Sequence, residues 1–194
     1  MSKLSRLWNF IWKSNSIWSW IINIILAFLI VKFLIYPGLG LILGTTHPVV
    51  AVVSSSMHHD ENFNDWFDGN DDWYLKHNIT KDYFKSFPMK NGFNKGDIII
   101  LTNPGKIKIG DIIVFRGNSN NPIIHRVVSL KLLQTKGDNN PEQYQALGET
   151  NINDEQLIGK AVFKVPWLGW VKITAACSIT SLKGNNFASC IKAG

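Results

Sequence analysis

The chain has 194 residues, which is enough for one globular domain of roughly 100–150 residues together with an appendage. Lysine and arginine outnumber aspartate and glutamate by 20 to 14, so the formal net charge is +6 at pH 7. A basic surface suits nucleic acid or an anionic membrane. The cations are scattered and no nucleic-acid-binding motif accompanies them, so we expect no nucleic-acid partner.

An apolar run over residues 17–36 predicts a transmembrane helix. Its roughly twenty residues suffice to cross a hydrocarbon core of about 30 Å, and only Ser19, Asn23 and Lys32 interrupt it. A cleaved signal sequence is the alternative, but such a sequence usually has a shorter apolar core followed by a site of small residues. We therefore expect an uncleaved, single-pass anchor in contact with membrane lipid.

The charges around this run predict its orientation. Basic residues precede it, and no acid occurs among the first 59 residues. The positive-inside rule then places residues 1–16 in the cytoplasm. Residues 37–194 are expected to form a domain on the outer face of the cell membrane.

Residues 60–95 differ in character from the rest of that domain. Seven of the chain's 14 acids fall between residues 60 and 82, among many aromatic residues. The segment interrupts a series of strands, so we expect an insertion with one or two short helices. It contains the glycosylation sequon Asn78-Ile79-Thr80, which is consistent with an external face.

The segments around this insertion predict a mostly β domain. Residues 49–53 are apolar and β-branched, which is typical of a buried strand. Further apolar runs separated by Gly, Asn and Pro turns predict strands over 96–103, 110–117, 122–138 and 157–173. The expected architecture is a mostly β domain with one N-terminal transmembrane helix and a partly helical insertion.

A serine cluster and a strand histidine are the candidate chemistry. Ser54, Ser55 and Ser56 end the strand over 49–53, and a serine becomes a nucleophile when a base takes its proton. His125 interrupts an otherwise apolar strand, where a buried imidazole needs a hydrogen-bond partner. Taken alone it is more simply a satisfied core histidine. Asp138 follows the next predicted strand and could orient it, although its Gly-Asp-Asn-Asn setting is also a good turn.

Four sequence blocks resemble the type I signal peptidases. They are Ser-Ser-Ser-Met at 54–57, GDIIVF at 110–115, IIHRVV at 123–128 and TKGDNN at 135–140, in the order in which they occur in that family. A histidine precedes the Arg-Val pair where the bacterial branch has a lysine. The resemblance is therefore to the archaeal and endoplasmic-reticulum branch, and it leaves residues 60–95 uncovered.

The resemblance implies roles for individual residues. It makes Ser56 the nucleophile and His125 the general base and then general acid. Ser54 matches a position that helps to bind the oxyanion in the bacterial branch, and Met57 would line the substrate site. Asp138 matches the first of two acids in the family's GDNN region.

The sequence departs from the family at the second of those acids. The position six residues after Asp138 is Tyr144. Other acids stand near it, and among them Asp154 could supply the carboxylate if the loop is longer here. The acid that orients His125 is therefore Asp138 or Asp154 in this interpretation; the remaining nearby acids are Glu142, Glu149 and Glu155.

The function implied by the resemblance is a membrane-bound serine endopeptidase that removes N-terminal signal peptides from exported preproteins, in possible contact with the translocation machinery. Such chemistry needs no metal and no cofactor. Two alternatives remain open: a serine hydrolase with another peptide substrate, and an anchored surface β-domain that binds partners without catalysis. Cys177 and Cys190 match no metal-binding motif, and the sequence does not determine whether they pair.

Overall fold

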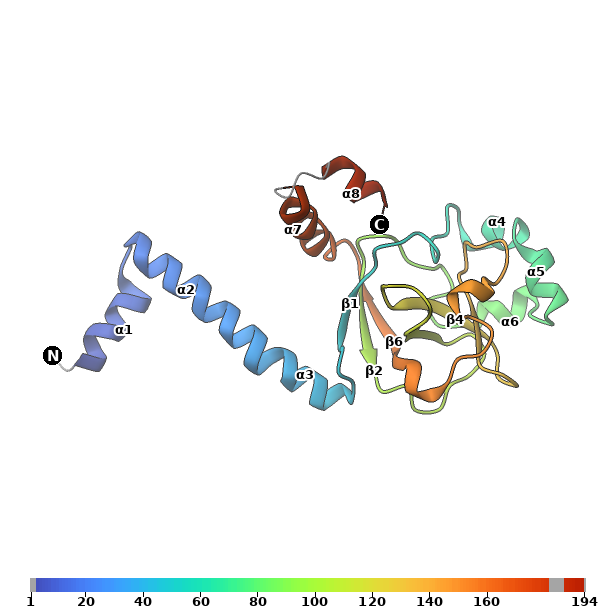
Figure 1. Cartoon of the computed structure of the whole chain (residues 1–194), viewed down its shortest axis with the longest axis horizontal. Coiled ribbons are helices and arrows are strands. Elements are labelled where there is room, and N and C mark those ends of the chain that lie inside the picture. Colours follow the sequence, from blue (N-terminus) through green and yellow to red (C-terminus); the bar gives the residue numbers. More distant parts are fainter. Residues whose placement is uncertain (1–2, 182–186, 194) are drawn as a thin grey trace. The chain divides into compact units, whose positions relative to one another are not determined.

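The computed structural model describes residues 3–181 and 187–193, which fall into two compact units (Figure 1). The first unit ends at residue 46 and the second begins at residue 47.

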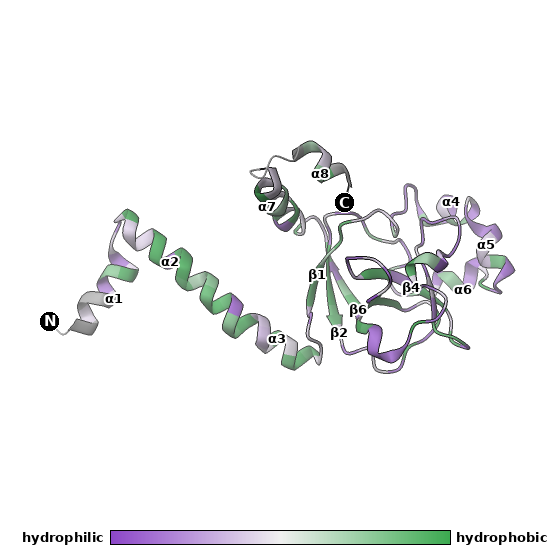
Figure 2. Cartoon of the chain, in the orientation of Figure 1, coloured by the Kyte–Doolittle hydropathy of each residue, from purple (hydrophilic) through white to green (hydrophobic). Residues whose placement is uncertain are grey.

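The first unit is helical. Helix α1 (Lys3–Lys13) precedes one continuous apolar helix of 27 residues, which comprises α2 (Ile17–Ile30), the π-helical segment η1 (Val31–Ile35) and α3 (Tyr36–Leu43). Among the described residues this is the one helix long and apolar enough to cross a membrane. Figure 2 shows that it is predominantly hydrophobic along its length.

This helix runs past residue 36, where the predicted anchor ends. Pro37 has no N–H to offer the carbonyl group four residues earlier, and the wider π-helical segment directly before it accommodates that break. The helix ends at Gly44, whose φ of 63° is left-handed and whose N–H donates to the Gly40 carbonyl. Glycine adopts this conformation without the steric cost of a Cβ atom.

The second unit is built on a six-stranded antiparallel sheet with the strand order β1-β2-β6-β3-β4-β5. Its strands are β1 (Val49–Ala51), β2 (Ile98–Thr102), β3 (Ile112–Phe115), β4 (Ile123–Ser129), β5 (Gln134–Lys136) and β6 (Leu157–Val165). All four residues of β3 are buried, because the strand lies in the interior of the sheet and both of its faces are covered. Strand β2 alternates instead: Ile99 and Leu101 are fully buried, and their neighbours are partly exposed.

The insertion contains three short helices, α4 (Phe63–Asp68), α5 (Asp71–Lys76) and α6 (Lys81–Lys85). Side chains cap two of them: Asn62 Oδ1 accepts from the first turn of α4, and Thr80 Oγ1 accepts the N–H of Tyr83. Their inner faces pack with neighbouring loop residues and with β4 in a mainly aromatic cluster, which comprises Trp66, Phe67, Tyr74, Ile79, Phe84, Phe87 and Val128. The acids face outward, so this part of Figure 2 is largely hydrophilic.

Two helices near the C-terminus were not predicted. Strand β6 ends at Val165, although the apolar pattern continues to 173, because Pro166 cannot donate to a sheet and Trp167 turns the chain with a φ of 61°. Helix α7 (Trp170–Ser181) and helix α8 (Phe187–Ala193) follow. A disulfide between Cys177 and Cys190 joins them, which answers the open question of cysteine pairing.

The predicted architecture is confirmed: a mostly β domain, one apolar N-terminal helix and a partly helical insertion. The predicted strand over 122–138 is a hairpin of β4 and β5, and the other predicted strands extend a few residues too far at their ends.

Candidate active site

Backbone hydrogen bonds hold the segment that contains Ser54, Ser55 and Ser56 at both of its ends. Before it, the Val52 N–H donates to the Asp97 carbonyl and the Val52 carbonyl accepts from the Gly96 N–H, each at 2.9 Å. After it, the Phe93 N–H donates to the Met57 carbonyl at 2.9 Å. Residues 53–56 therefore form an exposed or partly exposed loop between two fixed points, at the end of β1.

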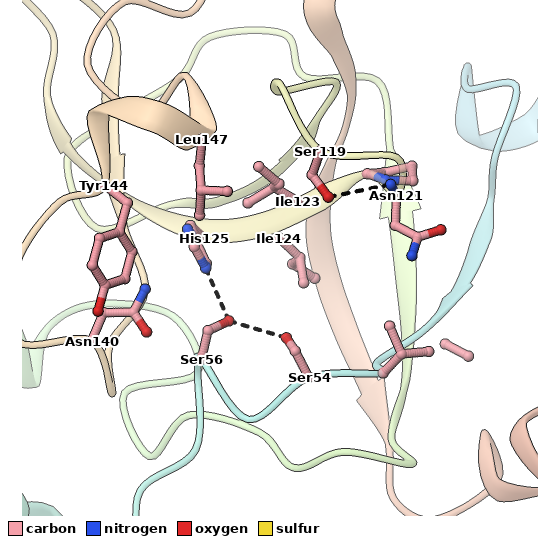
Figure 3. A pocket seen from close by; sticks show the side chains of 13 residues that line it. Ser54, Ser56, Ser119, Asn121, Ile123, Ile124, His125, Asn140, Tyr144 and Leu147 are labelled. Carbon is pink, nitrogen blue, oxygen red and sulfur yellow. Dashed lines mark hydrogen bonds between the residues drawn. The ribbon is translucent and has the colours of Figure 1, made fainter. Parts of the chain in front are cut away.

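Ser56 and His125 are hydrogen-bonded to each other. The Ser56 hydroxyl lies 2.9 Å from His125 Nε2, across 69 positions of sequence (Figure 3). Strand β4 places His125 with its side chain almost fully buried, at 3% exposure, whereas Ser56 is partly exposed. The pair therefore has its base inside the domain and its hydroxyl at the surface.

Glu149 is the carboxylate that contacts His125. Its Oε1 is hydrogen-bonded to His125 Nδ1, and its Oε2 accepts the N–H of Tyr144 at 2.5 Å. The 3₁₀ helix η2 (Gln145–Leu147) and the left-handed Gly148, with a φ of 81°, fold the loop so that Glu149 points inward. Glu149 is completely buried, so its carboxylate is held in a fixed place beside the imidazole.

These contacts fit one tautomer of His125. A carboxylate at Glu149 can only accept hydrogen bonds, and the tautomer that satisfies it carries the proton on Nδ1. The Nε2 lone pair is then free to accept the proton of the Ser56 hydroxyl. This is the arrangement in which a histidine acts as a general base toward a serine.

Ser54 lies on the other side of the nucleophile candidate. Its hydroxyl is 3.2 Å from the Ser56 hydroxyl, and both side chains come from the same loop (Figure 3). In the arrangement in which the Ser56 proton points to His125, the Ser54 hydroxyl donates to the Ser56 oxygen. Ser54 thus offers an O–H group next to the atom that would attack a substrate.

Asp138 lies close to this site but contacts other groups. Its buried carboxylate pairs with Arg126, accepting from Nε at 2.9 Å and from the guanidinium Nη2 at 2.7 Å. His59 Nε2, at 3.1 Å, and the Tyr74 hydroxyl, at 3.3 Å, are its further partners. The structure therefore places Asp138 in an ion pair beneath the site and not against His125.

The electrostatics of Asp138 follow from this setting. Burial alone would raise the pKa of its carboxyl, but Arg126 and His59 outweigh burial and hold that pKa well below its ordinary value. Asp138 is therefore ionised at every pH at which the fold would work. Burial also lowers the pKa of His59, against the opposing pull of Asp138.

The other two predicted residues do not line the groove beside Ser56. Asp154 is exposed at the first position of the 3₁₀ helix η3 (Asp154–Gln156), where its carbonyl accepts the N–H of Leu157. Met57 is 1% exposed and packs in the core, where its sulfur accepts the Asp138 N–H at 3.3 Å. Met57 thus packs in the core against the loop that contains Asp138.

A groove of about 350 Å³ opens beside Ser56 and His125. One wall is the serine loop with Ala51 and Val53, and the facing wall is the start of β4 with Ile123 and Ile124 (Figure 3). Polar side chains complete it: Ser119, Asn121, Asn140 and Tyr144. The groove thus runs between the end of β1 with its following loop and the start of β4, with aliphatic side chains on both walls.

Comparison with known proteins gives a consistent result. No protein-family model matches the chain. It is 28% identical over 158 residues to the signal peptidase complex catalytic subunit SEC11 of Komagataella phaffii, which covers 73% of this chain and 74% of that protein. The chain is a homologue of signal peptidase catalytic subunits. This confirms the resemblance to the endoplasmic-reticulum branch that the four sequence blocks indicate.

Shorter matches reach higher identity. The SEC11 subunit of Plasmodium falciparum is 32% identical over 96 residues, which is 44% of this chain and 52% of that protein. The corresponding subunit of Sclerotinia sclerotiorum is 35% identical over 99 residues, or 44% of this chain and 57% of that protein.

Sequence reasoning missed Glu149 as the partner of His125. The family's spacing directs attention to the position of Tyr144, and here Tyr144 supplies a backbone N–H to Glu149 instead of a carboxylate to the histidine. One signal was available: Gly148 directly precedes Glu149, and a glycine there permits the left-handed turn that reverses the loop.

Proposed function

We propose that this chain is a membrane-anchored signal peptidase in which Ser56 is the nucleophile, His125 the general base and Glu149 the acid that orients it. The observation that carries the proposal is the unbroken series of hydrogen bonds from the Ser56 hydroxyl through His125 to the Glu149 carboxylate. The homology to catalytic subunits of signal peptidase complexes supports the substrate class.

The first step is the attack on the scissile carbonyl. As the Ser56 oxygen bonds to the carbonyl carbon, its proton passes to His125 Nε2, and Glu149 stabilises the imidazolium that forms. The negative charge develops on the former carbonyl oxygen. The Ser56 N–H and the Ser54 hydroxyl are the donors that we propose for it, since a donor near that oxygen lowers the barrier.

The second step restores the enzyme. His125 gives its proton to the leaving amine, the amide C–N bond breaks, and the mature protein departs with a new N-terminus. Water then attacks the acyl carbon with His125 again as base. The bond from that carbon to the Ser56 oxygen breaks, His125 returns its proton to that oxygen, and the signal peptide leaves with a new carboxyl group that ionises in solvent. Each proton that His125 takes up is released again, and no metal or cofactor enters this scheme.

The groove fits an extended peptide. A substrate strand between the serine loop and the start of β4 would find backbone groups on both sides. The aliphatic side chains of the two walls would accommodate its small apolar side chains. Such a segment would carry small residues at alternate positions, because alternate side chains of a strand face the same wall.

The membrane placement is part of the proposal. We infer that the helix Ile17–Leu43 anchors the chain with its N-terminus in the cytoplasm and the β unit on the opposite side, where a translocated signal sequence would meet it. Membrane lipid and signal peptides are then the expected partners, and the translocation machinery or further subunits of a complex are possible ones.

The test is cleavage of a secretory precursor by the full-length chain reconstituted in liposomes. Mass spectrometry should find one cut, directly after a small-x-small sequence, and a precursor with bulky residues at those two positions should remain intact. Equal cleavage of both precursors would mean that the chain is a serine hydrolase with another specificity. Binding of the precursor without any cleavage would support the anchored binding domain instead.

A further inference from the structure

The insertion contacts the loop beside Ser56 and His125 through the carboxylate of Asp138. We propose that residues 60–95, together with His59, form a positioning element that holds the loop 137–140 against Ser56 and His125 by way of Asp138. The inference rests on the proposed function for the roles of Ser56 and His125. Its physical basis is a set of contacts that can be measured without any substrate.

The loop 137–140 contacts both members of the proposed pair. The Asn139 N–H donates to the Ser56 carbonyl at 2.8 Å, and the Asn139 side chain donates to the Ser55 carbonyl at 3.2 Å. Gly137 stands against the imidazole, since a Cβ atom added there would lie 2.8 Å from His125 Nε2. A shift of this loop would therefore move the serine and the histidine relative to each other.

Asp138 holds this loop, and one group from the sheet and two groups from outside it hold Asp138. Arg126, on β4, supplies the ion pair. The other two donors are His59, which directly precedes the insertion, and the Tyr74 hydroxyl on α5. Since Asp138 and Tyr74 are both fully buried, these contacts fix the loop to the insertion and not to solvent.

The insertion also fixes the other two groups in this network. The Trp66 ring lies flat on the His59 ring, with 3.5 Å between the ring centres and 6° between the planes. The Arg126 guanidinium donates to the Pro88 carbonyl at 2.9 Å and to the Met89 carbonyl at 3.1 Å. Two of the three partners of Asp138 are therefore themselves held in place by residues 60–95.

The orientation of His59 makes its contact directional. Its Nε2 faces the Asp138 carboxylate, whereas its buried Nδ1 has no hydrogen-bond partner among the described residues. A proton on Nδ1 would be buried without an acceptor, so the ring is neutral with its proton on Nε2. His59 therefore donates only through Nε2, and the stacked Trp66 ring keeps that atom facing Asp138.

The decisive experiment compares two substitutions of His59 in the full-length chain. His59→Phe keeps a flat ring on Trp66 and removes the donor, whereas His59→Gln loses the stack and keeps an N–H near the position of Nε2. Lys81→Ala is the matched control, because it removes only exposed contacts within the insertion, the ion pair with Asp68 and the hydrogen bond to the Asn64 carbonyl. Amide hydrogen exchange at Asn139 reports opening of the loop 137–140, and exchange at β2 and β6 reports opening of the sheet. Neither measurement requires an active enzyme.

We expect His59→Phe to speed exchange at the Asn139 amide by about tenfold or more, the effect of losing a hydrogen bond to a charged group. His59→Gln should restore most of the protection, and Lys81→Ala should match the wild-type chain. With a cleavable precursor, His59→Phe should lower kcat by up to about 100-fold, the cost of roughly 1 Å of misplacement, and leave KM unchanged.

Three results would overturn the inference: unchanged exchange at Asn139 in His59→Phe, no restoration in His59→Gln, or equal acceleration at β2 and β6, which would indicate general destabilisation. A wild-type chain that cleaves no precursor would refute the proposed function alone, since the exchange measurement would still decide the role of the insertion.

Discussion

His125 is hydrogen-bonded through Nδ1 to Glu149, while Asp138, the acid in the recognisable sequence block, is hydrogen-bonded to Arg126. The two carboxylates are both buried, but they do different work. Glu149 contacts the imidazole at Nδ1, and Asp138 pairs with the buried Arg126 guanidinium in a loop whose next residue, Asn139, donates to the Ser56 carbonyl.

The first prediction concerns Glu149→Gln. Glu149 accepts on both oxygens, from His125 and from the Tyr144 N–H, and glutamine has a single acceptor oxygen. If that oxygen serves Tyr144, the amide N–H₂ faces Nδ1 and forces the wrong tautomer of His125. We expect precursor cleavage to slow by up to about 10⁴-fold with the fold intact, and Glu142→Gln, at an exposed position, to have no effect. Wild-type rates in Glu149→Gln would contradict this assignment.

A second prediction tests the contact between Gly137 and the imidazole. The added methyl group of Gly137→Ala would lie 2.6 Å from Asn140 Nδ2 and 2.8 Å from His125 Nε2, so one of these groups must move. Displacing His125 should lower kcat by on the order of 100-fold. Gly69→Ala is the control, because the nearest atoms to its methyl group lie at 3.6 Å and 3.7 Å. Equal kcat in both variants would show that the Gly137 contact does not constrain His125.

The third prediction is acid sensitivity that arises from His59. The folded pKa of His59 lies below its ordinary value of 6.5 because the ring is buried, so the unfolded chain takes up this proton at a higher pH than the folded chain does. The unfolded state binds more protons in that window, and stability must fall as the pH drops below 6.5 toward the lowered pKa.

Denaturant unfolding at neutral pH and at about pH 5 would measure this loss, and the His59→Phe variant should lose less stability over the same interval. His77→Phe, at an exposed position, provides the control. An identical loss in the wild-type chain and in His59→Phe would assign the acid sensitivity to other groups.

The fourth prediction concerns the side of the membrane on which the β unit lies. Asn78 is exposed, with a left-handed φ of 61°, and begins a glycosylation sequon. In microsomes with glycosylation activity, the full-length chain should gain one glycan that Asn78→Gln removes. An unmodified chain whose β unit is digested by protease added outside intact vesicles would place that unit on the cytoplasmic side.

The sequence was sufficient for much of the fold. The apolar run and the β-branched segments identify the long helix and most strands, because burial imposes these patterns locally. The end of β6 and helix α7 were missed, since the apolar pattern continues through both and the change depends on one proline and one left-handed residue. Two such residues change the hydrophobicity pattern of a segment very little, so the pattern does not show where the strand ends.

The site residues that lie within contiguous sequence blocks could be predicted. Ser56 and His125 stand in segments that resemble a known family, and the structure brings them within 2.9 Å of each other. Glu149 lies in a loop whose length differs from the family pattern, and its place depends on backbone turns that no block records. The contacts of His59 and Tyr74 with Asp138 join residues that are 79 and 64 positions apart, respectively, and only the folded chain shows them.

Cleavage of a secretory precursor by the reconstituted wild-type chain and by Ser56→Ala, with the new N-terminus identified by mass spectrometry, decides whether Ser56 is the nucleophile. We expect the wild-type chain to release one mature protein that begins directly after a small-x-small sequence, and Ser56→Ala to release none. The same product at the same rate from Ser56→Ala would show that the serine is not the nucleophile.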